Sequence, residues 1–194
     1  MRKATKLTVD EFLAEYGDVH DGNLHELQDG EVIVSPPPMS EHGELHAVVN
    51  WLLGVYCEDY PSIRIFDASG VEFSEDTLRG PDISVMLPGD KVHFVEGRMV
   101  GTPALIVEIV SPSKPGLDLL VKRKLYTSKG VTEVWYLDPY ADEALFLNKV
   151  RAGSYHEAKM ETGVYESKVL KGLRVDVAAL FALDKKRLRK ALAR

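Results

Sequence analysis

Two acidic residues stand in apolar segments of the sequence, where a charge is costly. Glu108 interrupts ALIVEIV (residues 104–110), whose β-branched residues predict a strand buried on both faces. Asp82 follows Pro81 and opens a second apolar run, DISVML (residues 82–87). A buried carboxylate costs several kcal/mol unless it is paired, protonated or bound to a cation. Two acids on neighbouring strands would converge on one divalent cation; the alternative is that Glu108 pairs with a lysine and Asp82 caps a turn.

A polar stripe follows on the next predicted helix. Asp118, Lys122 and Tyr126 are spaced four residues apart, which places them on one face. Lys122 would orient an attacking water or neutralise charge that develops on a phosphate. The alternative is a surface ion pair between Asp118 and Lys122, worth a few tenths of a kcal/mol. Nothing local decides between the two, and from these residues alone the surface ion pair is the favoured interpretation.

Several other chemistries have no motif in this chain. The sequence lacks G-x-x-x-x-G-K-[ST], G-x-G-x-x-G and G-x-S-x-G, the motifs of phosphate loops, dinucleotide folds and hydrolase elbows. His42 and His46 are four residues apart, but Glu44 between them is misplaced for a metalloprotease helix. For these histidines an exposed helix face is the favoured interpretation over a zinc site.

The elements that must position these residues follow from apolar spacing and turn residues. Thr8 and Glu11 form a capping box that begins a helix over residues 8–16. Asp29-Gly30 supplies the tight turn of a hairpin over residues 24–34. Further helices are predicted over residues 41–58 and about 117–130, and strands over residues 62–73, 82–87, 104–110, 133–139 and 144–150. Short antiparallel strands to about residue 173 and a basic C-terminal helix would complete the chain.

This order of elements predicts an α/β fold with a central mixed β-sheet flanked by helices. The 194 residues fit a single domain. No apolar run reaches the roughly 20 residues of a membrane-spanning helix, and the N-terminal segment lacks the apolar stretch of a signal peptide. Cys57 is the only cysteine, which excludes an intrachain disulfide and four-cysteine zinc sites and favours a reducing cytoplasm.

Charge is distributed unevenly along the chain. The net charge is −6, with 24 basic and 30 acidic residues. The last eleven residues, DKKRLRKALAR, hold six basic residues and one acid, so residues 1–183 carry a net charge of −11. An acidic body does not attract nucleic acid by its overall charge. Contact with nucleic acid would therefore need a local basic patch, for which the C-terminal segment is a candidate, or metal ions held by the protein's own carboxylates.

Six segments of the sequence, taken in order, carry a resemblance to a known family. They are HELQDGEV (25–32), PPPMSEHGELH (36–46), GPDISVM (80–86), LIVEIVSPS (105–113), DLLVKRKLY (118–126) and GVTEVWYLDP (130–139). Together they resemble the Uma-type putative restriction endonuclease family of the PD-(D/E)XK nuclease superfamily. The resemblance runs from about Leu7 to Pro139 and implies a restriction-endonuclease-like core at about residues 8–139. Residues 140–194 would add short strands and the basic C-terminal helix.

The resemblance also implies roles for individual residues. Asp82 and Glu108 match the metal-binding acids of the superfamily, and Glu26 matches an acid that often supports the site. The superfamily usually places a lysine two residues after the glutamate, where this chain has Val110. Lys122 matches the lysine that takes over in D-x-x-x-K-x-x-x-Y, and Lys124 is the reserve candidate.

The expected function is metal-dependent endonuclease cleavage of phosphodiester bonds in DNA. The expected catalytic residues are Asp82, Glu108, Lys122 and Glu26, with Mg²⁺ or Mn²⁺ on the first two and with Tyr126 and His42 at the rim. The expected partner is DNA, with no membrane partner; a homodimer stays open. One alternative is a non-catalytic nucleic-acid-binding or assembly module with the nuclease fold. Another is a metal-independent hydrolase that uses Glu26 and Glu108 as acid and base.

Overall fold

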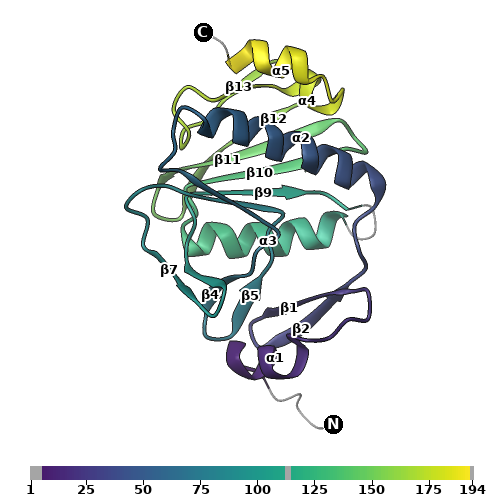
Figure 1. Ribbon diagram of the computed structural model, residues 1–194, viewed down its shortest axis with the longest axis vertical. Coiled ribbons are helices and arrows are strands. Elements are labelled where there is room, and N and C mark those ends of the chain that lie inside the picture. Colours follow the sequence, from purple (N-terminus) through teal and green to yellow (C-terminus); the bar gives the residue numbers. More distant parts are fainter. Residues whose placement is uncertain (1–5, 112–114, 193–194) are drawn as a thin grey trace.

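The computed structural model describes residues 6–111 and 115–192, with side chains described from Leu119 onward in the second range. Within these residues the chain forms five helices and fourteen strands, arranged as in Figure 1. In chain order they are α1 (Val9–Tyr16), β1 (Leu24–Gln28), β2 (Glu31–Ser35), α2 (Ser40–Cys57), β3 (Arg64–Asp67), β4 (Val71–Ser74), β5 (Thr77–Arg79), β6 (Ile83–Met86), β7 (Val92–Val95), β8 (Arg98–Gly101), β9 (Leu105–Ile109), α3 (Pro115–Lys129), β10 (Glu133–Asp138), β11 (Glu143–Arg151), β12 (Ser154–Met160), β13 (Val164–Glu166), β14 (Arg174–Asp176), α4 (Val177–Phe181) and α5 (Lys185–Leu192).

The central sheet has six strands in the order β12-β11-β10-β9-β6-β3. Strands β9 and β10 are parallel and are joined through α3, while the other neighbours are antiparallel. Alternate residues of β9 enter two different apolar clusters, because successive side chains of a strand point to opposite faces. Leu105 and Val107 pack with α2, and Ile106 packs with α3. The two helices therefore cover opposite faces of one mixed sheet, which confirms the predicted α/β fold.

A second six-stranded sheet, in the order β2-β1-β5-β4-β8-β7, was not predicted. The predicted single strand over residues 62–73 is in fact two strands, β3 in the central sheet and β4 in the second sheet. The backbone turns between them at Ala68, whose φ is 41° and whose N–H donates to the carbonyl oxygen of Asp82. Alternation of apolar residues is the same whether a strand continues or crosses to another sheet, so the pattern could not show this break.

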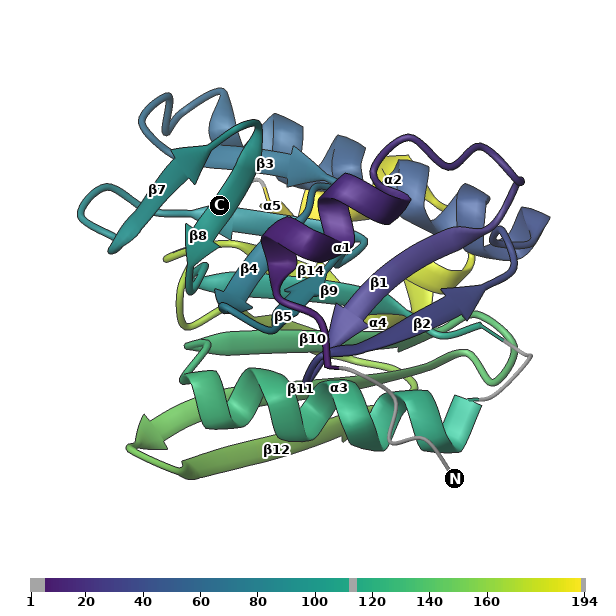
Figure 2. The ribbon, with the colours of Figure 1, turned by 90° about the horizontal axis from the view of Figure 1, so that it is seen from below.

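The second sheet and α1 form the end of the molecule away from α5, as Figures 1 and 2 show. Val9 and Phe12 of α1 pack on Leu27 and Leu78 of this sheet. The predicted capping box is confirmed, because the Thr8 side chain accepts from the Glu11 N–H and the Glu11 carboxylate accepts from the Thr8 N–H.

The predicted hairpin of β1 and β2 is also confirmed. Asp29 and Gly30 turn the chain with φ values of 52° and 79°. Positive φ at both positions is what a tight two-residue turn requires.

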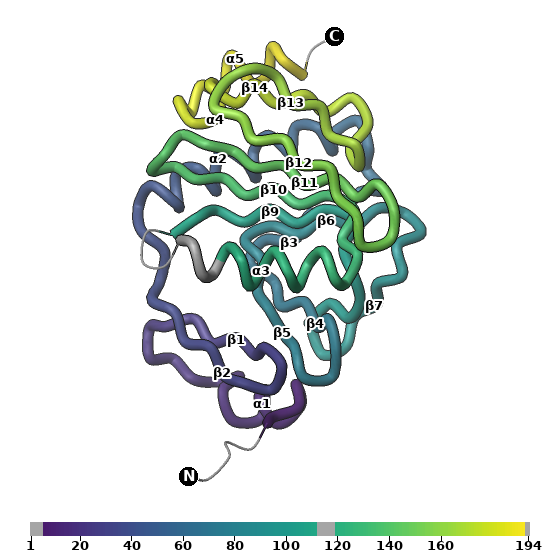
Figure 3. The backbone as a smooth tube through the Cα atoms, turned by 180° about the vertical axis from the view of Figure 1, so that it is seen from behind, coloured from purple at the N-terminus to yellow at the C-terminus, as the bar shows by residue number. Residues whose placement is uncertain are grey.

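Residues after 139 complete the central sheet and its apolar core. Strands β11 and β12 extend the sheet, and Tyr165, Leu170 and Leu188 join the cluster around α2. The basic helix α5 lies beside α2 at one end of the molecule (Figure 3). Two of its cationic groups, on Lys185 and Arg189, lie 5.5 and 5.8 Å from the ring centre of Trp51. Among the described helices, none is both long and apolar enough to cross a membrane.

Candidate functional site

Strand pairing brings the two predicted acids together. In the antiparallel pair of β6 and β9, Ile83 lies opposite Val107, and Ser84 lies opposite Ile106. One further step in this register places Asp82 opposite Glu108, and opposite residues of an antiparallel pair point to the same face. The Asp82 carboxylate oxygen Oδ2 accepts a 2.6 Å hydrogen bond from the N–H of Ile109, the residue after Glu108.

Glu108 is buried and takes both of its described partners from α3. The Lys122 ammonium donates to Glu108 Oε2 at 2.7 Å, and the Tyr126 hydroxyl donates to Oε1. Burial, aided by the nearby charge of Asp82, raises the pKa of Glu108 to about 7, although Lys122 and Tyr126 act in the opposite direction. Burial and the charge of Glu108 raise the pKa of Tyr126 well above its usual value, so this hydroxyl stays a proton donor.

Asp82 is held from the start of α2. His42 Nε2 lies 3.1 Å from Asp82 Oδ1, and His46 Nε2 lies 3.1 Å from the Asp82 carbonyl oxygen and 3.0 Å from Asp67 Oδ1. The predicted exposed helix face for the two histidines is therefore wrong: His42 is buried and His46 half-buried. The reason is that the first two turns of α2 lie against the strand end that carries Asp82, a contact between segments 36 or more residues apart.

Glu26 lies on β1 and contacts a buried arginine. Its Oε1 accepts from the N–H of Gly80 at 2.8 Å and lies 3.2 Å from Arg79 Nε. Arg79 is 1% exposed and also donates to Gln28 Oε1 at 3.1 Å. Sequence reasoning missed Arg79, whose single signal is a charged residue directly before the segment GPDISVM of the family resemblance.

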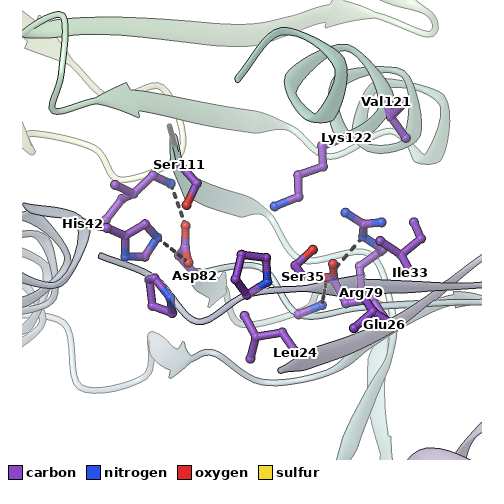
Figure 4. A pocket seen from close by; sticks show the side chains of 15 residues that line it. Leu24, Glu26, Ile33, Ser35, His42, Arg79, Asp82, Ser111, Val121 and Lys122 are labelled. Carbon is purple, nitrogen blue, oxygen red and sulfur yellow. Dashed lines mark hydrogen bonds and ion pairs between the residues drawn. The ribbon is translucent and has the colours of Figure 1, made fainter. Parts of the chain in front are cut away.

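A pocket of about 320 Å³ is lined by Glu26, His42, Arg79, Asp82 and Lys122, but not by Glu108 (Figure 4). In Figure 4, Lys122 points from α3 toward the side of the pocket that holds Asp82, and Arg79 points toward Glu26. The lining residues come from β1, β2, the segment after β2, α2, β5 and the β5–β6 connection, β9 and the segment after it, and α3. Side chains from both sheets therefore meet in one cavity.

The other residues singled out from the sequence lie in different surroundings. Lys124 is exposed and is not among the residues that line the pocket. Tyr126 is 0% exposed, so its predicted place at the rim is wrong. Its hydroxyl contacts Glu108 from below, because the face of α3 that carries Tyr126 packs on the central sheet. Val110 and Lys122 line one small cavity of about 20 Å³ together with Glu108. The Asp118 side chain, the Pro112-Ser113 part of the family segment, and Arg194 lie outside the described residues.

Asp82 and Glu108 offer carboxylate oxygens to a divalent cation. Carboxylate oxygens suit Mg²⁺ and Mn²⁺, and Mg²⁺ commonly takes one or two protein carboxylates and completes its shell with water and substrate phosphates. In the described part of the chain, no three His, Cys, Asp or Glu side chains lie close enough to hold a metal ion. Burial is the main cause of the raised pKa of Glu108, and the nearby charge of Asp82 adds to it, so a cation bound between the two acids would favour the charged form of Glu108. Two carboxylates of this kind fit a cation that takes its other ligands from water and substrate.

Comparison with known proteins identifies the class to which this fold belongs. The crystal structure of a putative nuclease belonging to DUF820, from Anabaena variabilis, superposes with a TM-score of 0.74 at 18% identity over 91% of this chain and 98% of that chain. The fold is thus that of a protein described as a nuclease.

The family follows from the sequence. The profile of the Uma2 family, described as "putative restriction endonuclease", matches residues 9–178, and the chain belongs to this family. No curated protein matches the chain. Family and fold together indicate a restriction-endonuclease-like nuclease.

Proposed function

We propose that this protein is a divalent-metal-dependent nuclease that hydrolyses phosphodiester bonds in DNA. The observation that supports the proposal best is the convergence of Asp82, Glu108 and Lys122 from three elements on one recessed site, with Lys122 Nζ 2.7 Å from Glu108 Oε2. The proposed compartment is the cytoplasm, since Cys57 is the only cysteine.

Asp82 and Glu108 are the proposed ligands of Mg²⁺ or Mn²⁺. When bound, such an ion polarises the phosphoryl group and lowers the pKa of a coordinated water. The Ile109 N–H and His42 hold the two oxygens of Asp82, which fixes the direction of this carboxylate. Tyr126 holds one oxygen of Glu108 and leaves the other to Lys122. The described contacts therefore orient both proposed ligands before any substrate arrives.

Lys122 is the proposed positioning cation, in place of the lysine that the superfamily usually carries at the position of Val110. Both residues line the cavity of about 20 Å³ beside Glu108, which is large enough for about one water molecule. From this place the ammonium would orient the attacking water or stabilise charge on the phosphate oxygens. Because its stem reaches in from α3, the lysine supplies its charge without occupying a position on β9.

Glu26 is the proposed supporting acid, through Arg79 and Gly80. Its contacts hold the backbone two residues before Asp82 and neutralise a guanidinium that is 1% exposed. In the present arrangement of the described residues it does not form a group of three with Asp82 and Glu108. Its proposed role is therefore to position the segment that carries Asp82.

The test is cleavage of plasmid and single-stranded DNA by the full chain in Mg²⁺, Mn²⁺ and EDTA. We expect cleavage with either metal and none in EDTA or in the Glu108→Gln variant. The matched control is Glu157→Gln, because Glu157 forms a surface ion pair with Arg123 and should leave the rate unchanged. Full activity in EDTA would instead show metal-independent hydrolysis with Glu26 and Glu108 as acid and base. DNA binding without cleavage would show a non-catalytic module.

A further inference from the structure

The pocket has one apolar wall, and this wall is open to solvent. Leu24 and Ile33 lie on one face of the β1–β2 hairpin and line the pocket, and Leu24 is 53% exposed. Pro36 and Pro38, in the segment after β2, are exposed and also line it. Exposed apolar side chains that gather at the mouth of a cavity are typical of ligand sites, whereas single ones are common anywhere.

Two charged groups that line the pocket are recessed: Asp82 has a side-chain exposure of 21% and Lys122 of 16%. Glu108, at 4%, lies in the cavity of about 20 Å³ that shares Lys122 with the pocket. A phosphodiester group must therefore enter the pocket to reach them. A cavity of about 320 Å³ is at the lower end of small-ligand pockets, so it has room for about one nucleotide-sized group.

We propose that this pocket takes one unpaired nucleotide of a DNA strand, with its base on the wall of Leu24, Ile33 and the two prolines and its phosphate toward Lys122. The inference rests on the proposed function and specifies its substrate as single-stranded or locally unpaired DNA. A base has two apolar faces that aliphatic side chains and proline rings can cover, while its phosphate needs a cation. The two sides of the pocket match these two halves of a nucleotide.

Paired DNA meets an obstacle at the same place. Its bases are stacked and joined to a partner strand, so a single nucleotide can enter only after it has been unstacked and unpaired. That cost is already absent in a single strand, a bubble or a frayed end. Single-stranded DNA should therefore bind at least about tenfold more tightly than a closed duplex.

The test measures binding by fluorescence anisotropy with the Glu108→Gln protein in Mg²⁺, which separates affinity from cleavage. The probes are a labelled single strand and a duplex of the same sequence closed by hairpins at both ends. The wall variant adds Leu24→Ser and Ile33→Ser, and the matched control adds Val150→Ser and Val164→Ser, which are 69% and 45% exposed and do not line the pocket. We expect the wall variant to bind the single strand about tenfold more weakly and the duplex as before. The control should keep the preference.

Three outcomes would overturn the inference in distinguishable ways. If the closed duplex binds as tightly as the single strand or more tightly, the pocket does not take an unpaired nucleotide. The same follows if the wall variant keeps the preference for the single strand. If the wild-type protein with Mg²⁺ also cuts closed duplex as fast as a single strand, the proposed function stands and only this substrate class is wrong. If the protein neither binds nor cuts any DNA, the proposed function itself fails.

Discussion

Two glutamates are buried on neighbouring parallel strands of the central sheet, and they face opposite sides. Glu133 at the start of β10 is 0% exposed, and its carboxylate accepts from five neutral donors. These are Trp135 Nε1 at 2.6 Å, the hydroxyl groups of Tyr165 and Ser167 at 3.0 Å, and the N–H groups of Lys168 and Val169 at 2.8 Å. Glu108 on β9 is 3% exposed, but its partners are one lysine and one tyrosine, and a second acid lies nearby.

The difference separates a structural carboxylate from a reactive one. The donors of Glu133 come from the backbone and from short or rigid side chains, so the charge is neutralised by fixed dipoles. Glu108 depends on the long side chain of Lys122, which can move away when another cation or a phosphate arrives. Burial alone therefore does not mark a functional acid, whereas burial beside a like charge and a lysine at a pocket does.

The largest expected effect is on stability, in the Glu133→Ala variant. Removal of the Glu133 carboxylate leaves several buried hydrogen-bond donors without an acceptor, and each unpaired donor lowers the free energy of unfolding by about 1–3 kcal/mol. We expect a loss of about 4–5 kcal/mol, which lowers Tm by roughly 8–20 °C for a domain of this size. Thermal unfolding measures it, with Glu157→Ala as a surface control worth less than about 1 kcal/mol. A loss below that limit for Glu133→Ala would erase the contrast between the two glutamates.

The next effect is on catalysis, in the Lys122→Ala variant. Loss of one electrostatic donor costs about 10²- to 10³-fold in kcat. Metal affinity should stay nearly unchanged, because an ammonium has no lone pair for a cation. Single-turnover cleavage rates and metal titration measure the two quantities. The control is Lys124→Ala, because Lys124 is exposed. A larger loss of kcat in Lys124→Ala than in Lys122→Ala would show that Lys124, not Lys122, has this role.

A third effect is the pH dependence of stability that Glu108 introduces. Its pKa in the folded protein is about 7, above the ordinary value of 4.5, so between these pH values the folded state keeps a proton that the unfolded chain has released. Stability therefore falls as pH rises through this window, by about 3 kcal/mol in all. The Glu108→Gln variant cannot titrate here and lacks this loss.

Melting curves in EDTA measure the difference. At pH 5 the two proteins should melt at similar temperatures, and at pH 8 the Glu108→Gln variant should melt higher, by roughly 6–12 °C. A variant that melts lower than wild type at pH 8 would mean that the lost ion pair with Lys122 outweighs the relieved repulsion from Asp82.

The smallest effect is stabilisation by metal. For a site with a Kd of about 1 mM, Mg²⁺ at about 10 mM adds roughly 1.4 kcal/mol to the free energy of unfolding. That amounts to about 3–6 °C in Tm. The shift should occur in wild type and in Glu157→Gln, and should vanish in Asp82→Asn. The same shift in Asp82→Asn would place the cation elsewhere.

The parts of the fold that depend on local signals could be predicted from the sequence. The Thr8 capping box, the Asp29-Gly30 turn and the apolar run of β9 each lie within a few neighbouring residues. The second sheet could not be predicted, because β5, β7 and β8 are only three or four residues long. The pairings that join the local hairpins into one sheet, β1 with β5 and β4 with β8, link residues 51 and 28 positions apart. The partners of these strands are chosen by packing, which no short stretch of sequence records.

The candidate site divides in the same way. Glu108 and Asp82 are noticeable in the sequence because a charge conflicts with its apolar neighbours. Glu133 gives no such signal, since it stands at the edge of EVWYLDP and its Tyr165 partner lies 32 residues further on. The contacts of His42 and Arg79 likewise depend on how α2 and the hairpin approach β6, and are visible only in three dimensions.

The enclosure of Glu133 also orders events while the chain is being synthesised. All the candidate site residues have been added once Tyr126 is made, whereas the donors from Tyr165 to Val169 follow Glu133 by 32 to 36 residues. At a synthesis rate of about 5–20 residues per second, these donors are added on the order of 2–7 s after Glu133. A nascent chain halted between Glu133 and Tyr165 therefore carries every residue of the candidate site, but it lacks four of the five groups that donate hydrogen bonds to the buried Glu133 carboxylate.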